Sequence, residues 1–228
     1  MTSANAVPFV VAIDGPAGAG KSTVARGLAT RLGYTFLDTG ALYRSVALIA
    51  QRRRIPWDDT VHLGELARVL DVVFAKDGDG TRVVADGSDV TQDIRQAEIS
   101  EGASRVSAVP EVRAGLLAIQ RRVAARANVV AEGRDIGTVV FPAAQAKFFL
   151  VANSETRARR RTLELAAAGK PAIFADVLAE MLARDARDSG RAVAPLRRAE
   201  DAVEIDSSLL TPEEVMAHML AVVRARGG

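Results

Sequence analysis

Apolar residues in this chain gather in five short runs that are rich in β-branched and aromatic side chains. Runs of this length are typical of strands that are buried on both faces of a sheet. The five runs are FVVAI (9–13), YTFL (34–37), VVA (129–131), KFFLV (147–151) and AVEI (202–205). Helical patterns lie between them, and strands that alternate with helices predict an α/β fold with a parallel sheet covered on both faces.

The helical patterns have recognisable starts and ends. Val24, Leu28 and Leu32 repeat at every fourth position, and Gly33 is placed to end that helix. A second apolar stripe follows a proline and consists of Val112, Leu116, Ile119 and Val123. Near the end of the chain, the sequence TPEE from Thr211 predicts a capping box with proline at the first helical position.

One segment, residues 71–90, interrupts the alternation. Its sequence DVVFAKDGDGTRVVADGSDV has short β-like runs separated by Asp-Gly pairs, which favour hairpin turns. We therefore predict a small antiparallel insertion here, with a turn at DGDG (77–80). The alternative for DGDG is a calcium loop, but the glycine and the final glutamate of that pattern are missing.

Composition restricts the function without choosing it. The chain has 228 residues, of which 49% are hydrophobic, and this suits one large domain with a sizeable core. Thirty basic and 28 acidic residues leave a net charge of only +2, which gives no reason to expect a nucleic-acid partner. Cysteine is absent, which excludes disulfides, thiolate metal sites and a cysteine nucleophile. His62 and His218 are far apart and are expected at the surface rather than as ligands.

We expect a cytoplasmic protein without a membrane partner. No uncharged stretch approaches the ~20 residues that span a bilayer. The N-terminus lacks a basic start and reaches Asp14 too early for a signal peptide. The lack of cysteine also fits a reducing compartment.

The strongest chemical signal is the sequence that follows the first predicted strand. The pattern G-x-x-x-x-G-K-[ST] is complete from Gly15 to Ser22, with a strand before it and a helix after it. Glycines let backbone N–H groups point inward as an anion site, while Lys21 can reach the β- and γ-phosphates and the Ser22 hydroxyl can ligate Mg²⁺. We predict a nucleoside triphosphate site formed by Gly15, Pro16, Ala17, Gly18, Ala19, Gly20, Lys21, Ser22 and Thr23.

Two further polar clusters follow predicted strands, at the edge where open α/β sheets bind ligands. DTGALYR delivers Thr39 and Arg44 after the second strand. EGRD follows the third strand and presents Arg134 and Asp135 at a tight turn. Structural alternatives remain for both clusters: Asp38 could be a helix cap, and Arg134 and Asp135 could form an ordinary surface pair.

A fourth cluster, ARDARDSGRAVAPL, carries three arginines on one helical face. Arg184, Arg187 and Arg191 are spaced at i, i+3 and i+7, and Arg184 forms an i, i+4 pair with Asp188. Alone, an exposed helix of this kind needs no function, because such pairs contribute only about 0.3–0.5 kcal/mol. Together with the phosphate loop and the two clusters above, it favours a second phosphate-bearing substrate, because arginine binds phosphate bidentately.

These motifs together resemble bacterial cytidylate kinases, a family of P-loop nucleoside monophosphate (NMP) kinases. The resemblance covers nearly the whole chain, through IDGPAGAGKST, LDTGALYR, VPEVR, AEGRDIGTVVFP, RDARDSGRAVAPL and IDSS. It implies a P-loop three-layer α/β sandwich with a five-stranded parallel sheet. The implied organisation is a single domain, 1–228, with a core of about 1–60 and 108–228, a β-containing NMP-binding insertion of about 61–107 and a short lid of about 156–192.

The resemblance also implies a CMP site. Its residues would be Thr39, Arg44, Ser104, Arg113, Arg134, Asp135, Arg184, Asp188 and Arg191. The acceptor phosphate would be held by Arg44, Arg134 and Arg191, and the ribose by Arg184 and Asp188. Ser104 and Thr39 would lie near the cytosine, whose amino donor suits the Asp135 carboxylate and whose acceptor edge suits Arg113.

On the donor side, the resemblance assigns a basic segment to the lid. NSETRARRRTLEL carries Arg157, Arg160 and Arg161, which would close over the ATP phosphates. A basic, solvated helix is an equal alternative for this segment. Thr39 and Glu132 vary the side chains associated with the family motifs, where serine and aspartate also fit.

The implied reaction is in-line transfer of a phosphoryl group from ATP, with Mg²⁺, to CMP or dCMP. The acceptor oxygen is already anionic near neutral pH, so that positioning and charge neutralisation suffice. The implied catalytic residues are Lys21, Arg44, Arg134 and Arg191. We expect a monomer with small-molecule substrates and no nucleic acid.

Three other P-loop functions serve as alternatives. A kinase for shikimate or dephospho-coenzyme A would not need Ser104, Arg113 and Asp135 as a base-reading set. A GTPase-type switch would need an Asn-Lys-x-Asp motif, but none of the lysines follows an asparagine. A nucleic-acid-dependent ATPase would predict ATP turnover that is stimulated by a polynucleotide.

Overall fold

The computed structural model describes residues 7–77 and 80–228. The chain forms two compact units, Met1–Leu37 with Arg121–Gly228, and Asp38–Gln120. We call the first the large unit and the second the small unit. The boundaries expected for the core, the insertion and the lid stay a prediction.

A five-stranded parallel sheet forms the centre of the large unit. Its strands are β1 (Val10–Asp14), β2 (Thr35–Asp38), β6 (Val129–Gly133), β7 (Ala146–Val151) and β8 (Val203–Asp206), in the order β2-β6-β1-β7-β8. β1 pairs in parallel with β6 and β7, and β7 pairs in parallel with β8. All five predicted strands are confirmed to within two residues. Every residue of β1 and β6 is buried, as expected for strands covered on both faces.

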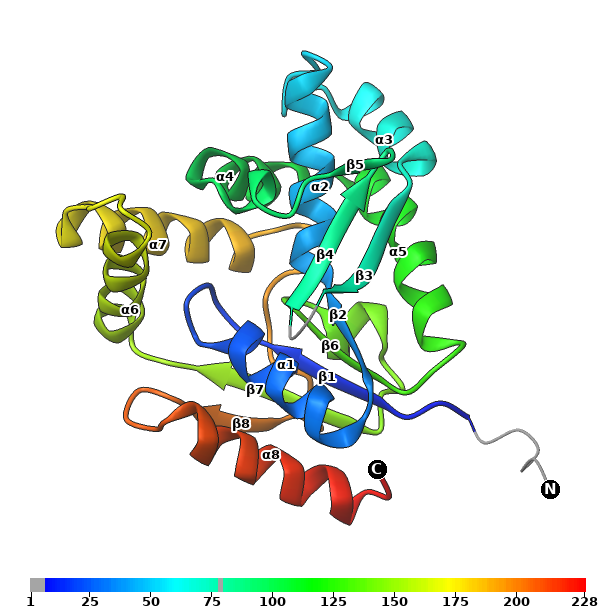
Figure 1. The fold of residues 1–228 in the computed structure, drawn as a ribbon, viewed down its shortest axis with the longest axis vertical. Helices are drawn as coiled ribbons and strands as arrows, with labels where there is room; N and C mark the ends of the chain where they lie inside the picture. Colours follow the sequence, from blue (N-terminus) through cyan, green and yellow to red (C-terminus); the bar gives the residue numbers. More distant parts are fainter. Residues whose placement is uncertain (1–6, 78–79) are drawn as a thin grey trace. The chain divides into compact units, whose positions relative to one another are not determined.

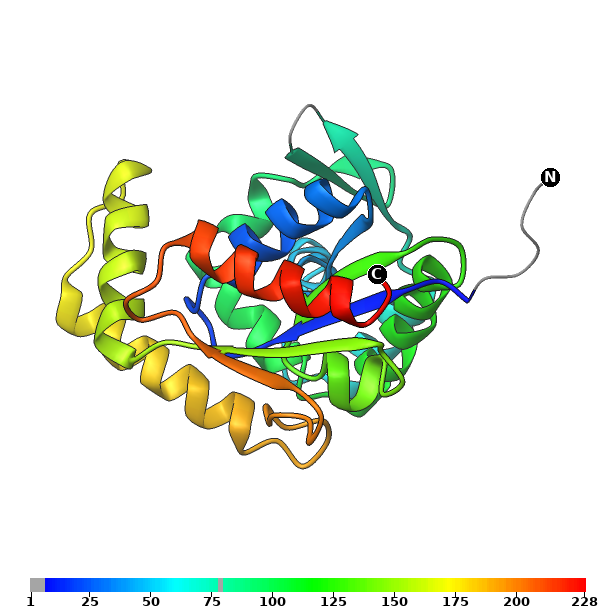
Figure 2. The same cartoon turned by 90° about the horizontal axis from the view of Figure 1, so that it is seen from below.

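Helices α1 (Lys21–Leu32) and α8 (Pro212–Ala225) pack together against the sheet (Figure 2). Their shared core includes Leu28, Phe148 and Met219. The predicted end of α1 and the predicted start of α8 are both confirmed. Gly33 ends α1 in a left-handed conformation with φ 67°, and Thr211 forms the capping box of α8 with Glu214.

Two further helices of the large unit form a hairpin (Figure 1). α6 (Ser154–Ala167) and α7 (Phe174–Ser189) pack through Ala158, Val177 and Met181, which are all buried. A five-residue π-helical turn, η2 (Ile136–Val140), begins directly after Asp135, the last residue of the EGRD cluster.

The small unit has its own apolar core. The elements of this unit are α2 (Thr39–Arg52), α3 (Thr60–Val69), β3 (Val72–Asp77), β4 (Gly80–Ala85), β5 (Ser88–Asp89), the short turn η1 (Asp93–Arg95), α4 (Ala97–Val106) and most of α5 (Pro110–Ala124). β4 pairs antiparallel with β3 and β5, which confirms the antiparallel insertion predicted for 71–90. The turn expected at DGDG includes residues 78–79, which lie outside the described residues. Across the described parts of the chain, no helix has both the length and the hydropathy that crossing a membrane requires.

Candidate active site

The loop between β1 and α1 has a backbone that glycine alone adopts easily. Gly15, Gly18 and Gly20 have φ angles of 149°, 75° and 89°. A Cβ atom on Gly15 would lie 2.0 Å from the carbonyl oxygen of Leu150, and one on Gly18 would lie 3.2 Å from Cβ of Arg157. Neighbouring segments thus fix the loop on two sides. It leads into the first turn of α1, whose N–H groups favour an anion.

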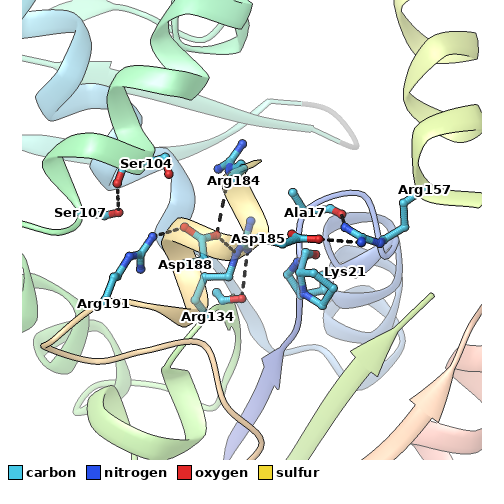
Figure 3. A network of polar contacts seen from close by, with 12 residues as sticks. Ala17, Lys21, Ser104, Ser107, Arg134, Arg157, Arg184, Asp185, Asp188 and Arg191 are labelled. Atoms are coloured by element: carbon cyan, nitrogen blue, oxygen red, sulfur yellow. Dashed lines mark hydrogen bonds and ion pairs between the residues drawn. The ribbon is translucent and has the colours of Figure 1, made fainter. Parts of the chain in front are cut away.

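Lys21 reaches back across this loop. Its ammonium group donates a hydrogen bond of 2.6 Å to the carbonyl oxygen of Pro16, and the residue is only 5% exposed (Figure 3). Burial lowers the pKa of Lys21 to about 7, and the positive charge of Arg134 acts in the same direction, while Glu132 opposes it. An anion bound in the loop would favour the charged form of Lys21.

The buried carboxylate of Asp14 connects the phosphate loop to the EGRD turn. Its two oxygens accept hydrogen bonds of 2.7 Å from the backbone N–H groups of Ile136 and Gly137. Burial raises the pKa of Asp14 to about 6, although both N–H donors act against this. The sequence reading missed this role. The available signal was a charged residue at the end of a wholly apolar strand.

Asp188 on α7 gathers three arginines of the large unit (Figure 3). Nε of Arg134 donates to Oδ2 at 2.9 Å, Nη2 of Arg191 bonds to Oδ1, and Nε of Arg184 lies 4.0 Å from Oδ2. Burial acts to raise the pKa of Asp188, but the guanidinium groups of Arg134, Arg191 and Arg184 outweigh it and hold that pKa below its usual range.

This arrangement shows whether Arg134 belongs to an ordinary surface pair or to a buried cluster of charges. The pair predicted between Arg184 and Asp188 is present. The surface-pair alternative for Arg134 and Asp135 is wrong, because Asp135 is only 4% exposed and Arg134 forms an ion pair with Asp188. The cluster therefore concentrates positive charge around one buried carboxylate, on the same unit as the phosphate loop.

Arg157, at the start of α6, is held by three different segments. Nε donates to the carbonyl oxygen of Ala152 at 3.0 Å, Nη1 to that of Ala17 at 2.9 Å, and Nη2 to Asp185 at 2.6 Å. The residue is 5% exposed, which rules out the solvated-helix alternative at this position. Since Ala17 belongs to the phosphate loop, Arg157 lies at the edge of the predicted ATP site.

The other two arginines of α6 have different surroundings. Nη2 of Arg160 donates to the backbone oxygen of Ser207 at 2.6 Å, and the Ser207 hydroxyl donates to the carbonyl oxygen of Ala19 at 3.0 Å. Arg160 thus reaches the phosphate loop through one serine. Arg161 forms a 3.2 Å pair with Glu164 on the helix surface, as the solvated-helix alternative describes.

In the small unit, Asp38 shapes the start of α2. Its side chain accepts a hydrogen bond from the N–H of Ala41 at 2.9 Å, which confirms the helix-cap alternative. The same carboxylate pairs with Nη2 of Arg44 at 2.8 Å. Thr39, the first residue of α2, is 3% exposed. The cap therefore also orients a predicted site residue.

Ser107 links Arg113 to Ser104 in the small unit, and Tyr43 contacts Arg113; the sequence reading missed both Ser107 and Tyr43. The guanidinium of Arg113 lies 5.6 Å from the centre of the Tyr43 ring and donates to the carbonyl oxygen of Ser107 at 3.2 Å. The Ser107 hydroxyl donates to the carbonyl oxygen of Ser104 at 2.9 Å. Tyr43 directly precedes Arg44 in ALYR, which was the only sequence signal for it.

The predicted CMP residues therefore form two groups, one in each unit. The small unit holds Thr39, Arg44, Ser104 and Arg113. The large unit holds Arg134, Asp135, Arg184, Asp188 and Arg191. The predicted ATP residues, Gly15–Thr23 with Arg157, Arg160 and Arg161, all belong to the large unit.

Both histidines lie at the surface, as expected: the side chain of His62 is 63% exposed and pairs with Asp59, and His218 is exposed. Within the described residues, no three His, Cys, Asp or Glu side chains are grouped to hold a metal ion. The hydroxyl of Ser22 remains the predicted contact to Mg²⁺, and Ser22 is exposed at the start of α1.

Comparison with known proteins identifies the family of this chain. The family model for cytidylate kinase matches residues 11–225. Cytidylate kinases of Geobacter sp. (strain M21), Citrifermentans bemidjiense and Geobacter sulfurreducens are 54%, 52% and 50% identical to this chain. These matches cover 95%, 95% and 99% of this chain and 93%, 93% and 97% of the relatives. The chain belongs to the cytidylate kinase family.

Proposed function

We propose that this protein transfers the γ-phosphoryl group of ATP to CMP and dCMP, which yields ADP with CDP or dCDP. The observation that carries the proposal is the cluster of Arg134, Arg184 and Arg191 around Asp188, in the same unit as the phosphate loop. Two like charges ~4 Å apart repel by roughly 4 kcal/mol at an effective dielectric near 20. An enzyme that brings two phosphates together needs such a second cationic site.

The donor would bind in the phosphate loop, residues 15–23. The N–H groups of the loop and the first turn of α1 would face the phosphates, and Lys21 would contact the β- and γ-phosphates. Ser22 fits a role in holding Mg²⁺, because it offers an accessible hydroxyl oxygen and Mg²⁺ binds few protein ligands beside phosphate oxygens and water. When bound, the ion supplies charge neutralisation at the phosphates.

The acceptor phosphate would be held by Arg44, Arg134 and Arg191. Each guanidinium has five N–H donors in a planar fork, so that an arginine bonded to a carboxylate keeps donors for a phosphate. Asp188 would keep Arg134 and Arg191 oriented before the substrate arrives. Arg184 and Asp188 would contact the ribose.

The base would be read by Asp135 and Arg113, with Ser104 and Thr39 beside them. A carboxylate accepts from the amino group of cytosine, and a guanidinium donates to its N3 and O2 edge. Uracil presents an oxygen in place of the amino group and would repel the same carboxylate. This difference supports cytosine nucleotides as acceptors.

The mechanism would rest on position and charge rather than on a general base. The acceptor phosphate oxygen is anionic near neutral pH. It would attack the γ-phosphorus of ATP in line with the bond to ADP, which breaks as ADP leaves. The catalytic residues would be Lys21, Arg44, Arg134 and Arg191, which neutralise the charge that spreads over the transferred group. Closure of the insertion and the lid would exclude water, a competing acceptor.

A panel of nucleoside monophosphates tests this function. ADP release from Mg-ATP is measured with CMP, dCMP, UMP, AMP and no acceptor. CMP and dCMP should give the highest turnover. If they gave no more ADP than AMP or buffer, the proposal would be wrong.

A single substitution tests the reading of the base. Asp135→Ala should lose CMP affinity while ATP binding survives, because the carboxylate is assigned to the cytosine amino group. Equal loss of ATP and CMP binding would count against that role. We further propose that the protein is a cytoplasmic monomer, for which light scattering should give the mass of one chain, 24.1 kDa.

A further inference from the structure

Helix α7 carries two aspartates, three residues apart, that hold arginines of different parts of the site (Figure 3). Asp188 holds the arginines assigned to the acceptor. Asp185 holds Arg157, through a 2.6 Å bond from Nη2 to Oδ2. Neither the family motifs nor the sequence reading gave Asp185 a role.

Arg157 has one charged partner among its three contacts. Its other two bonds go to backbone oxygens, those of Ala152 after β7 and Ala17 in the phosphate loop. The side chains of Arg157 and Asp185 are 6% and 21% exposed, so that their charges interact largely outside bulk water. The second oxygen of Asp185 is buried and accepts no hydrogen bond from any described residue. The Asp185 charge is therefore directed to Arg157.

The same helix touches the phosphate loop directly. A Cβ atom built on Gly18 would lie 2.7 Å from the terminal methyl carbon of Met181 and 3.2 Å from Cβ of Arg157. Met181 lies one helical turn before Asp185 on α7. The loop, Arg157 and α7 therefore pack directly against one another, with no other segment between the loop and α7 at this contact.

We propose that Asp185 is a positioning residue that sets Arg157 against the ATP loop and, through α7, couples ATP binding to the acceptor arginines held by Asp188. This inference rests on the proposed function. Phosphates entering the loop would bind the Arg157 donors that its three hydrogen bonds leave over, while Asp185 holds the guanidinium in place. Any resulting shift of α7 also moves Asp188, less than one turn further along the helix. Linkage then requires that CMP change the affinity for ATP by the same factor as ATP changes that for CMP.

A purely structural role for the Arg157–Asp185 pair makes a different prediction. A buried ion pair is often no more stabilising than apolar residues of the same volume, and removing one partner chiefly lowers stability. A positioning role instead changes the affinity for ATP and its dependence on CMP. Binding measurements therefore separate the two roles, whereas a melting temperature alone does not.

The experiment compares Asp185→Ala and Asp185→Asn with the wild-type chain. The dissociation constant of a non-hydrolysable ATP analogue is measured by calorimetry, without CMP and then with saturating CMP. Glu180→Gln, an exposed acid on the same helix, is the matched control. Asp185→Ala should weaken analogue binding about tenfold, as expected for a charge-assisted bond, and Asp185→Asn should weaken it less because one acceptor remains.

The second readout is the change that saturating CMP makes in the affinity for the ATP analogue. In the wild-type chain and in Glu180→Gln, CMP should tighten analogue binding, and in both Asp185 variants this effect should shrink toward none. If Asp185→Ala failed to fold, a double-mutant cycle of Asp185→Asn and Arg157→Lys gives the same answer. The loss of analogue affinity in the double variant should be smaller than the sum of the losses in the two single variants.

Two results would overturn the inference: variants with a lower melting temperature but wild-type analogue binding and CMP effect, or a wild-type chain in which CMP leaves analogue binding unchanged. Failure of the proposed function is distinguishable from both. It appears as a wild-type chain that binds ATP but forms no CDP, and binding of the analogue alone still tests the link between Asp185 and Arg157.

Discussion

The phosphate loop and the Asp188 cluster lie in the same unit and are both assigned to phosphates, yet different forces hold them. The loop depends on backbone sterics: Gly15 leaves no space for a side chain beside Leu150. The cluster depends on charge: Asp188 attracts arginines from two separate segments. A site formed by the backbone is encoded by neighbouring residues, whereas a site formed by charge pairing is encoded by residues far apart. Substitutions should therefore affect the two regions in different ways.

The largest effect is expected where the backbone has no freedom. In Gly15→Ala, the new Cβ would lie 2.0 Å from a backbone oxygen, at φ 149°. We expect ATP turnover to fall by about 10³-fold or more, because each well-placed donor is worth roughly 10² to 10³ and the loop supplies several. Gly33→Ala is the matched control. It also has a left-handed φ, 67°, but no non-neighbouring atom of the described residues lies within 4 Å of the added Cβ.

The control should lose only about 1–2 kcal/mol of stability and bind ATP normally. Binding of an ATP analogue and the free energy of unfolding are measured for both variants. If Gly15→Ala bound the analogue as well as Gly33→Ala does, sterics would not be what shapes the loop.

The next effect concerns the charge-paired region. Asp188→Asn keeps the shape of the side chain but removes the counterion of Arg134, Arg184 and Arg191. We expect KM for CMP to rise about 100-fold, since loss of one partner from a buried charge pair costs about 2–5 kcal/mol. Binding of ATP alone should change little. Steady-state kinetics with each substrate varied in turn check this. A selective loss for ATP would show that Asp188 serves the donor site and not the acceptor site.

A pH effect should distinguish the loop from the cluster. Burial lowers the pKa of Lys21 to about 7 in the free protein, and bound phosphates should raise it again. Between pH 7 and pH 8 the charged fraction of free Lys21 falls, and ATP affinity should fall about fivefold with it. Calorimetry at pH 8 in buffers of different ionisation enthalpy should show proton uptake on binding. Zero uptake would mean that Lys21 is already charged in the free protein.

The smallest effects are expected at arginines outside both regions. Arg187 is exposed on α7, and Arg161 pairs with Glu164 on the surface of α6. Arg187→Gln and Arg161→Gln should each change kcat/KM by less than about twofold, because exposed pairs are worth roughly 0–1 kcal/mol. Initial rates with CMP and ATP check this. A loss as large as that of Asp188→Asn would place these arginines in the site.

Local patterns in the sequence predicted the elements well. The runs of apolar residues predicted the five strands, and Gly33 and Thr211 marked helix ends, because each signal concerns residues adjacent in the chain. The phosphate loop was predictable for the same reason. The Asp-Gly pairs likewise predicted the antiparallel sheet of the small unit.

Partners that are distant in sequence could not be predicted from such patterns. Asp14 bonds to Gly137, 123 residues away, and Arg157 to Ala17, 140 residues away. Helical spacing on α7 revealed the pair of Arg184 with Asp188, but only the fold adds Arg134, 54 residues from that aspartate. A candidate role could be assigned to each residue from its own chemistry, whereas the partner that orients it depends on tertiary structure.

Phosphorus NMR can identify the products directly and so show whether the phosphoryl group is transferred to CMP. The protein is mixed with Mg-ATP and CMP, and the phosphorus signals are followed over time. If CMP is the acceptor, CDP and ADP should appear in equal amounts, with little free phosphate. Formation of ADP and inorganic phosphate without CDP would contradict this prediction, because the acceptor would then be water rather than the phosphate of CMP.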